Sequence, residues 1–451
     1  MLSGELAEIL VELYSLSLTA CVPLSPLSAI LWQEVDRIQY HAETLKKAGY
    51  SYKYSKGYLQ KEHGLMLAWR CKPKQNGRSS DAIFEQEPVA SEILFYDDAE
   101  VSAGRTACSR LTRNIALFLA IKFQPTDGER DHTGPAGVIL ATTHLFWHPM
   151  HAYERVRQAS LLARYLQSFR NKEGATWSSW PTVLAGDFND QPHSASYALL
   201  TGRGLDNHGR AEIEQSSVVH QSVDKRTEAA RRRPTGALQD PAGLNNAAEP
   251  LDPKETSRED DVDHIDGDPT GDEEEQEAAD DQMLKSCRAA TTSDGLLTPE
   301  DLIALFNTSH KPTSIGCESV QPAPGHMLSA YGSKYALLQD PQESDNMFST
   351  STRGRERWDD QDWKDGDLNV HRHLAGTTAG SEPMCTLYSS LFALTLDFIF
   401  LLPFKNNEGS PVYPAVTRLL RTHRTEVVKE GLPRKGICVS DHMAIGAELE
   451  F

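Results

Sequence analysis

The sequence lacks any closely spaced pair of cysteines. Seven cysteines are spread over 451 residues, and no two of them form a Cys-x-x-Cys motif. This scatter fits neither a zinc site nor a disulfide framework, so we expect the protein to lie in a reducing compartment inside the cell, in the cytoplasm, the nucleus or the nucleolus. The motif His-Glu-x-x-His is also absent, which disfavours a zinc hydrolase.

Long hydrophobic runs are missing as well. No apolar stretch reaches the length of about 20 residues that a membrane-spanning helix requires. The N-terminus has no basic stretch ahead of an apolar core, so we expect neither a secretory signal nor a membrane partner. Hydrophobic residues make up 39% of the chain, which is low for a compact globule, and part of the chain is therefore expected not to pack.

Basic charge is scarce, but the deficit is local. The formal net charge is −19, and residues 251–282 alone hold fifteen acidic residues against two basic ones, which leaves about −6 for the rest. The global charge therefore does not exclude a nucleic-acid substrate. Residues 206–295 are rich in Asp, Glu, Ala, Gly and Pro and poor in large apolar groups. They predict an acidic disordered insertion, for which a basic protein would be the partner.

Apolar runs that end in polar groups mark the ordered part of the chain. Residues 137–149, 182–189 and 394–404 each follow this plan, which is typical of strands in a sheet covered on both faces. Between the first two runs, residues 152–169 have apolar side chains at helical spacing. The succession of strand, helix and strand predicts a layered α/β domain.

Seven polar residues stand at the ends of such runs: Glu34, His144, Asp187, Asn189, Asp397, Asp441 and His442. Each one alone has an ordinary explanation, because a Glu after a strand is usually a solvated loop residue and Asp with Asn before a Pro is usually turn chemistry. Asp397 is less ordinary, since a carboxylate flanked by Leu396 and Phe398 needs a partner once it is buried.

Together these residue types suit metal-assisted hydrolysis of a phosphodiester. Carboxylates are the ligands that Mg²⁺ prefers, and Glu34 with Asp441 can provide them. Asp187 can orient or deprotonate a water beside the amide of Asn189. The two histidines and this amide can donate to the charge that develops on the phosphate, and a buried Asp can fix the tautomer of a His.

The order of the motifs resembles that of the endonuclease/exonuclease/phosphatase superfamily. The resemblance rests on "QEVD", "THL", "GDFN", "LDFIF" and the terminal "SDH". Within it, "HLFWHP" and "GLPRKG" are similar to the RNA-nuclease branch of carbon-catabolite-repression deadenylases, nocturnin and Angel, and most like its fungal RNA exonucleases. The resemblance implies a DNase I-like, two-sheet α/β sandwich of four layers, with strand ends of both sheets forming one metal-bearing cleft.

The resemblance also implies a division of the chain. Residues 1–205 and 381–451 would be the N-terminal half and the C-terminal part of one catalytic domain. The acidic disordered insertion at 206–295 would separate them, followed by a short helix and an irregular insertion at 296–380. Thr298, followed by Pro, is the expected N-cap of that helix.

Carried over residue by residue, the resemblance assigns metal and substrate roles. Glu34 would be the principal ligand of Mg²⁺ or Mn²⁺, and Asp441 would face the metal directly or through water. Asp187 would position or activate the attacking water. Asn189 would hold the scissile phosphate, and His144 would also bind the phosphate.

The resemblance assigns supporting roles too. His442 would contact the phosphate while paired with Asp397. Asn114, in "LTRNIAL", matches a supporting position of the family. Trp147 and Phe188 can stack on a substrate or shape the cleft, but aromatic residues next to strands usually pack, so we expect core packing for both.

One departure from the family concerns its first strand, which carries an Asn that supports the metal. Residues 1–30 contain no Asn, and residues 4–18 have the pattern of an amphipathic helix. We therefore expect the first strand of the sandwich to be missing, with impaired solubility and activity as the consequence.

The function expected from these features is that of an Mg²⁺-dependent 3′-to-5′ exoribonuclease, acting in RNA processing or poly(A) trimming with RNA as its substrate. Two alternatives remain. One is a phosphomonoesterase of the same superfamily that acts on a phosphoinositide or a nucleotide phosphate. The other is a degenerate, non-catalytic paralogue that works as an interaction protein.

Overall fold

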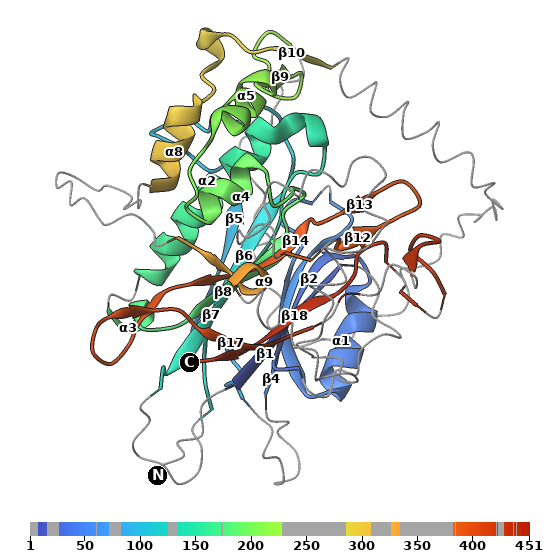
Figure 1. Ribbon diagram of the computed structural model, residues 1–451, viewed down its shortest axis with the longest axis vertical. Helices are drawn as coiled ribbons and strands as arrows, with labels where there is room; N and C mark the ends of the chain where they lie inside the picture. The colour runs from blue at the N-terminus through green and yellow to red at the C-terminus, as the bar shows by residue number, and fades with distance from the viewer. Residues whose placement is uncertain are drawn as a thin grey trace, which may run out of the picture.

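Two six-stranded sheets form the centre of the molecule (Figure 1). The computed structural model describes residues 8–15 (backbone only), 27–59, 61–71, 83–124, 134–172, 175–227, 286–307, 326–333, 382–383, 385–420, 422, 428–435, 437–438 and 440–451. The sheets and the helices that cover them come from this part of the chain.

The first sheet runs, in spatial order, through β17 (Ala415–Leu419), β18 (Ile445–Glu450), β1 (Glu8–Ser15), β2 (Ala29–Val35), β4 (Gly64–Arg70) and β3 (Tyr50–Ser55). The second runs through β11 (Leu328–Ser329), β14 (Asp397–Leu402), β8 (Thr182–Asp187), β7 (Gly137–His144), β6 (Ile115–Lys122) and β5 (Ala90–Phe95). Both sheets mix parallel and antiparallel neighbours, with β1 parallel to β2 and β7 parallel to β8.

The inner faces of the two sheets share one apolar core. Leu31 and Leu67 of the first sheet pack in one cluster with Leu117, Leu140 and Ile399 of the second, and all five are fully buried. Because every strand places alternate side chains on opposite faces, the outer faces need cover of their own. That requirement positions the helices.

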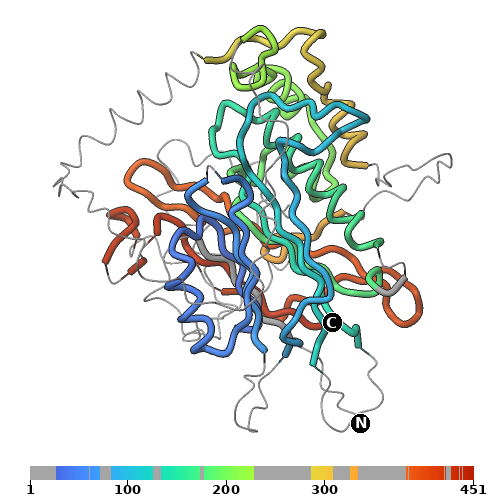
Figure 2. Tube along the Cα trace, turned by 180° about the vertical axis from the view of Figure 1, so that it is seen from behind, coloured from blue at the N-terminus to red at the C-terminus, as the bar shows by residue number. Residues whose placement is uncertain are grey.

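Helices supply the two outer layers (Figure 1, Figure 2). α1 (Ile38–Lys47) buries Leu45 against Trp32 and Met66 on the first sheet. α2 (Ala152–Arg170), α4 (Ala195–Leu200), α5 (Asn207–Gln215) and α8 (Pro299–Asn307) bury a second cluster that includes Phe118 and Phe398 of the second sheet. Helix, sheet, sheet and helices make four layers, which confirms the expected α/β sandwich.

Short elements complete the chain. They are α3 (Ala175–Ser178), α9 (Ala330–Ser333), the 3-10 helices Pro149–His151 and Thr292–Asp294, and three strand pairs: β9 (Val218–His220) with β10 (Cys287–Ala289), β12 (Leu387–Tyr388) with β13 (Ala393–Leu394), and β15 (Phe404–Lys405) with β16 (Pro411–Val412).

β1 corrects the expectation of a missing first strand. Residues 8–15, expected to be helical, lie between β18 and β2, where Val11 is paired with Ala447 on one side and with Ala29 on the other. A segment with mixed local preference takes the strand conformation when both of its edges find hydrogen-bond partners, because tertiary context overrides intrinsic propensity. The amphipathic helix and the missing strand were therefore wrong.

Part of the expected disordered insertion is ordered. α5 is capped by Asp206, whose carboxylate accepts from the Gly209 N–H at 2.8 Å, and it buries Ile213 completely. Arg288 then joins β10 to Asp224 and Asp294 by ion pairs of 2.6 Å each. These caps, apolar contacts and ion pairs outweigh the polar composition. Residues 228–285, with the acidic run, lie outside the described residues, and the domain boundaries stay a prediction.

The short helix after the insertion is confirmed as α8. Thr298 caps it through a reciprocal pair of hydrogen bonds, in which its Oγ1 accepts from the Asp301 N–H and its N–H donates to Asp301 Oδ2, both at 3.1 Å. Most of the irregular insertion that follows, at 308–325 and 334–380, lies outside the described residues.

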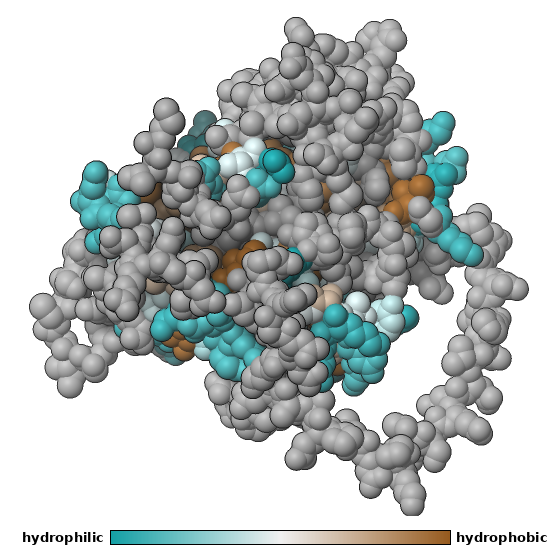
Figure 3. Space-filling model, turned by 90° about the horizontal axis from the view of Figure 1, so that it is seen from below, coloured by the Kyte–Doolittle hydropathy of each residue, from teal (hydrophilic) through white to brown (hydrophobic). Residues whose placement is uncertain are grey.

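The described surface has few large apolar groups. Among the coloured residues of the face seen from below, a few apolar patches lie beside hydrophilic residues (Figure 3). In the part of the chain that the structure describes, no helix combines the length and the apolar character needed to cross a membrane.

Replacing Val11 by proline tests the place of β1. Val11 lies in the middle of a strand that is paired on both sides, so proline removes a ladder donor and leaves a buried acceptor unpaired. We expect the free energy of unfolding in urea to fall by about 2 kcal/mol or more. Val11→Ala keeps the N–H and is the control. Equal stability of the two variants would contradict the pairing of β1 with both neighbours.

Candidate active site

His144, Asp187 and Asp397 form one row across the second sheet. β7 ends at His144, β8 ends at Asp187 and β14 begins at Asp397. In the strand register, His144 lies opposite Asp187, and Asp187 lies opposite Asp397. The register alone therefore brings together three residues that the sequence placed in separate motifs.

The turn after β8 holds Asn189 against Asp187. The N–H of Asn189 donates to Asp187 Oδ1 at 2.8 Å, and its side-chain amide donates to the Leu145 carbonyl at 3.0 Å. Asn189 has a φ of +49°, a conformation that Asn tolerates better than most residues. A β-carbon on Gly186 would lie 2.2 Å from the Thr143 carbonyl oxygen, so only glycine lets β7 and β8 approach here.

Glu34 reaches the row from the first sheet. The register of β2 against β4 shifts near its end, and Glu34 itself has a φ of +55°. Such a bulge re-aims a side chain. The preceding residue, Gln33, anchors the bulge to the second sheet, because its side-chain amide donates to Thr142 Oγ1 at 2.8 Å and both residues are fully buried. Glu34 Oε1 lies 3.7 Å from His144 Nδ1.

Asp397 and His442 form a buried hydrogen-bonded pair, as expected. His442 Nδ1 lies 2.8 Å from Asp397 Oδ2, and Thr386 Oγ1 receives the Asp397 N–H at 3.0 Å. Burial alone would lower the pKa of His442, but the carboxylates of Asp397 and Asp187 raise it to about 10. The ring is therefore protonated at neutral pH, with its Nε2 3.9 Å from Asp187 Oδ2.

His144 is neutral by contrast. Burial lowers its pKa to about 3, and the nearby Lys61 and His63 add to the effect. Its Nε2 lies 3.5 Å from Asp187 Oδ2, and its Nδ1 faces Glu34. A neutral imidazole has one N–H, so it can donate to only one of these carboxylates. The other carboxylate faces a lone pair, which leaves an excess of negative charge at this point.

The residues whose ligand atoms lie together differ from the expected metal ligands, Glu34 and Asp441. Among the described residues, Asp187, Asp397 and His442 each offer a ligand atom, and these atoms lie within 4.8 Å of one another. Glu34 is connected to this group through His144, while the charge of Asp441 contributes to the raised pKa of His442. The roles of Glu34 and Asp441 as metal ligands stay a prediction.

Two neighbours of the site were missed in the sequence. The ring of His63 stacks on that of His144 with centroids 6.3 Å apart. The charge of Glu34 acts on both His63 and Lys61. Their only signal in the sequence is their place just before the apolar run of β4, the strand that pairs with β2.

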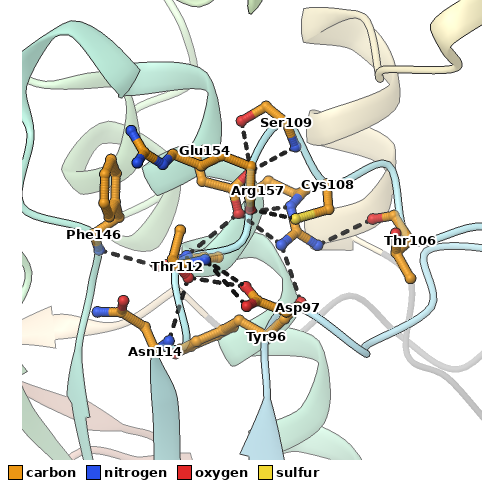
Figure 4. A network of polar contacts seen from close by, with 12 residues as sticks. Tyr96, Asp97, Thr106, Cys108, Ser109, Thr112, Asn114, Phe146, Glu154 and Arg157 are labelled. Atoms are coloured by element: carbon orange, nitrogen blue, oxygen red, sulfur yellow. Dashed lines mark hydrogen bonds and ion pairs between the residues drawn. The ribbon is translucent and has the colours of Figure 1, made fainter. Parts of the chain in front are cut away.

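Asn114 supports His144 through the backbone, as expected of a supporting position. Its side-chain amide donates to the His144 carbonyl at 2.6 Å. The loop before it is held by Asp97 (Figure 4), which accepts from the Thr112 N–H and hydroxyl at 3.0 Å each and from the Arg113 N–H at 2.8 Å. Thr112 Oγ1 in turn accepts from the Asn114 N–H at 3.3 Å.

Helix α2 anchors the same loop (Figure 4). Glu154 and Arg157 form a fully buried ion pair of 2.6 Å. Arg157 also donates to the carbonyl of Thr106, in the loop, and to that of Tyr96, just after β5, at 3.0 Å each. The Gln158 amide donates to Thr112 Oγ1 at 3.0 Å and accepts from the Phe146 N–H at 3.1 Å. One helix thus fixes the segments on both sides of the site.

The two aromatic residues next to the site behave differently. Phe188 is 1% exposed and packs edge-on against Phe398 and Phe400, which confirms its place in the core. Trp147 is 41% exposed, so the expectation of core packing was wrong for it. Its neighbours on both sides, Phe146 and His148, turn inward, and the extended backbone between them points Trp147 outward.

Comparison with known proteins agrees with this geometry. The model of the Endonuclease/Exonuclease/phosphatase family matches residues 20–265, more than half of the chain and all of the site except the strand and the loop that carry Asp397 and His442. The chain belongs to the endonuclease/exonuclease/phosphatase family.

The curated relatives of this family member are matched in part of their length. It is 33% identical to a probable RNA exonuclease of Schizosaccharomyces pombe over 38% of the chain and 30% of that protein. It is 30% identical to a probable RNA exonuclease of Saccharomyces cerevisiae over 50% of the chain and 41% of that protein. The chain therefore spans less than half the length of these relatives. A solved structure of ANGEL2, a 2′,3′-cyclic phosphatase, aligns with 98% of the chain and 96% of its own at 14% identity and a TM-score of 0.49.

Thr112→Val tests the hydrogen-bond network that holds the loop before β6 at the site. Valine keeps the shape but removes the hydroxyl that donates to Asp97 and accepts from the Gln158 amide and the Asn114 N–H. We expect the free energy of unfolding to fall by about 2 to 3 kcal/mol in urea denaturation. Thr112→Ser restores the hydroxyl and should recover most of the loss. A valine variant as stable as the serine variant would refute the role of the hydroxyl.

Asp397→Asn tests the charge of His442 in protein freed of divalent metal. The ring pKa, followed by NMR, should fall from about 10 in the parent protein to well below it in the variant. A pKa raised on folding stabilises the fold fully below the unfolded value of 6.5, and this contribution is lost as the pH rises through 10. His442 titrating near 6.5 in the parent protein would exclude a carboxylate-held imidazolium.

Proposed function

We propose that the protein is a divalent-metal-dependent phosphodiesterase that shortens RNA from its 3′ end. The observation that supports it most is the row of His144, Asp187 and Asp397, completed by His442 and joined by Glu34 from the other sheet. Membership of the family supports hydrolysis of a phosphate ester, and the relatives that are called RNA exonucleases support RNA as the substrate.

The residues present fit a hard cation. Asp397 Oδ1 is buried and has no hydrogen-bond partner among the described residues, and Asp187 Oδ2 faces two imidazoles without a short hydrogen bond to either. Carboxylate oxygens are the ligands that Mg²⁺ and Mn²⁺ prefer, so Glu34, Asp187 and Asp441 are the candidates to hold the ion. The ion, when bound, would supply Lewis-acid stabilisation of the phosphate charge.

The side chains around that position have separate tasks. Burial and the neighbouring Asp397 raise the pKa of Asp187 well above its usual range, which suits a base that takes the proton of the attacking water. The protonated His442 donates its Nε2 proton to a phosphate oxygen, while Asp397 holds the Nδ1 proton and so keeps the ring charged. Asn189, fixed by its own backbone bond to Asp187, orients the phosphate. His442 is cationic and Asn189 is neutral, so neither repels the phosphate anion.

A labelled RNA measures this activity directly. Oligo(A) and a structured RNA, each labelled at the 5′ end, are incubated with Mg²⁺, with Mn²⁺ or with chelator. We expect a ladder of 5′-labelled products shortened one nucleotide at a time, only in the presence of metal. Release of internal fragments would replace the exonuclease by an endonuclease, and cleavage in chelator would remove the metal from the mechanism.

Glu34→Ala should lower kcat by about 10³-fold or more, because it removes the carboxylate that the first sheet directs at the site. Asp36→Ala is the matched control, since this carboxylate lies two residues on, is 45% exposed and lies outside the site. We expect the control to keep its activity. Retention of a tenth of the activity in Glu34→Ala, with an unchanged Mg²⁺ requirement, would show that Glu34 is not a ligand.

A further inference from the structure

Two cationic side chains close to the site make no ion pair with the residues that the structure describes. They are Lys61, in the connection between β3 and β4, and Arg113, in the loop before β6. Burial lowers the pKa of Lys61. The negative charges of Glu34 and Asp97 act in the opposite direction, and the positive charge of Arg113 lowers the pKa further. The two cations are therefore close to each other and to the site, in a chain whose net charge is −19.

The connection that carries Lys61 is held firmly against the site. A β-carbon on Gly64 would lie 2.3 Å from the Ser55 carbonyl oxygen, so the ends of β3 and β4 are in direct backbone contact there. Two residues after Lys61, the ring of His63 rests on the ring of His144. Lys61 is partly buried and forms no ion pair with the described residues, so its ammonium still has donors for a phosphate oxygen.

The backbone of Arg113 has a strained conformation that the buried hydrogen bonds of Asp97 maintain. Its φ of +57° is one of four positive values at non-glycine residues in the described part of the chain, and two of the others belong to Glu34 and Asn189 of the site. Such a conformation is unfavourable for a residue with a β-carbon and persists where the surroundings enforce it. Asp97 enforces it here by accepting the Arg113 N–H at 2.8 Å. The side chain itself is exposed, one residue from the Asn114 that holds His144.

We propose that Lys61 and Arg113 bind a second phosphate of the RNA backbone, adjacent to the scissile one. The proposal rests on the proposed hydrolysis of RNA and deepens it. Lys and Arg are the usual ligands of backbone phosphates, which position a nucleic acid without reading its sequence. A substrate that has only the scissile phosphate cannot use this subsite. The enzyme should therefore select chains with at least two phosphates.

Three small substrates measure the subsite. ApA contains the scissile phosphate alone, whereas pApA carries one more phosphate on the 5′ side of the scissile bond and ApAp carries one more on the 3′ side. Charge-assisted contacts are worth about 1.5 to 3 kcal/mol, so at least one of the longer substrates should have a kcat/KM about 10- to 100-fold above that of ApA. The substrate that gains shows on which side of the scissile bond the subsite lies.

The variants are chosen to keep the fold. Lys61→Gln retains most of the side chain, and Arg113→Asn tolerates the left-handed backbone. In the double variant the preference over ApA should fall to near one, while Tm stays unchanged. Lys46→Gln, which removes an exposed charge on α1, is the control and should keep the full preference. A preference that survives in the double variant would overturn the subsite even though the RNase activity stands.

A binding measurement separates the subsite from the catalytic proposal. Fluorescent oligo(A) is titrated in chelator at several salt concentrations, where turnover does not occur. Each phosphate contact with single-stranded RNA contributes about 0.7 to the slope of log K against log salt, so the double variant, which loses one contacted phosphate, should lose about 0.7 and Lys46→Gln nothing. An unchanged slope in the double variant would refute the subsite. A changed slope in a protein that hydrolyses no RNA would leave the subsite standing and refute the proposed function.

Discussion

The burial of two carboxylates beside one imidazole constrains the rest of the site. Asp187 and Asp397 lie opposite each other on neighbouring strands, at 4% and 1% exposure. Burial removes the carboxylate of Asp187 from water, and the negative charge of Asp397 repels it. Both effects raise the pKa of Asp187. The proton on His442 offsets part of that charge through its 2.8 Å contact with Asp397. Further positive charge, from a cation or a neighbour, is needed for the whole group to stay ionised.

The strand register and several buried hydrogen bonds hold Asp187 and Asp397 close together despite this repulsion. The sheet register fixes the row, and glycine at 186 lets its strands approach. The bond from Gln33 to Thr142 ties the two sheets together beside Glu34. Gln158 of α2 bonds to Thr112, in the loop before β6, and to Phe146, in the loop after β7. Because these supports are buried hydrogen bonds between elements, removing one leaves an unpaired polar group as well as a looser site.

Charge at the site follows local geometry and differs from the charge of the chain. The formal net charge of −19 comes mostly from residues 251–282, which lie outside the described residues. Close to the carboxylates stand a protonated His442 and the cations Lys61 and Arg113. A phosphate ester approaching this edge therefore meets positive charge as well as the acidic row. An acidic protein can in this way accept a polyanionic substrate.

Local pattern was enough to predict β7, β8, β14 and α2 and the polar residues at the strand ends, because side-chain periodicity is written within a few residues of each element. The need of Asp397 for a partner was also foreseen, since a carboxylate in an apolar run requires one, and the family resemblance implied that this partner is His442. β1 was not foreseen, because its conformation depends on hydrogen bonds to β18, more than 430 residues along the chain. The position of Lys61 beside Glu34 and the outward turn of Trp147 have the same origin. They are set by which backbone edges and side chains meet after folding, and no local run of residues carries that information.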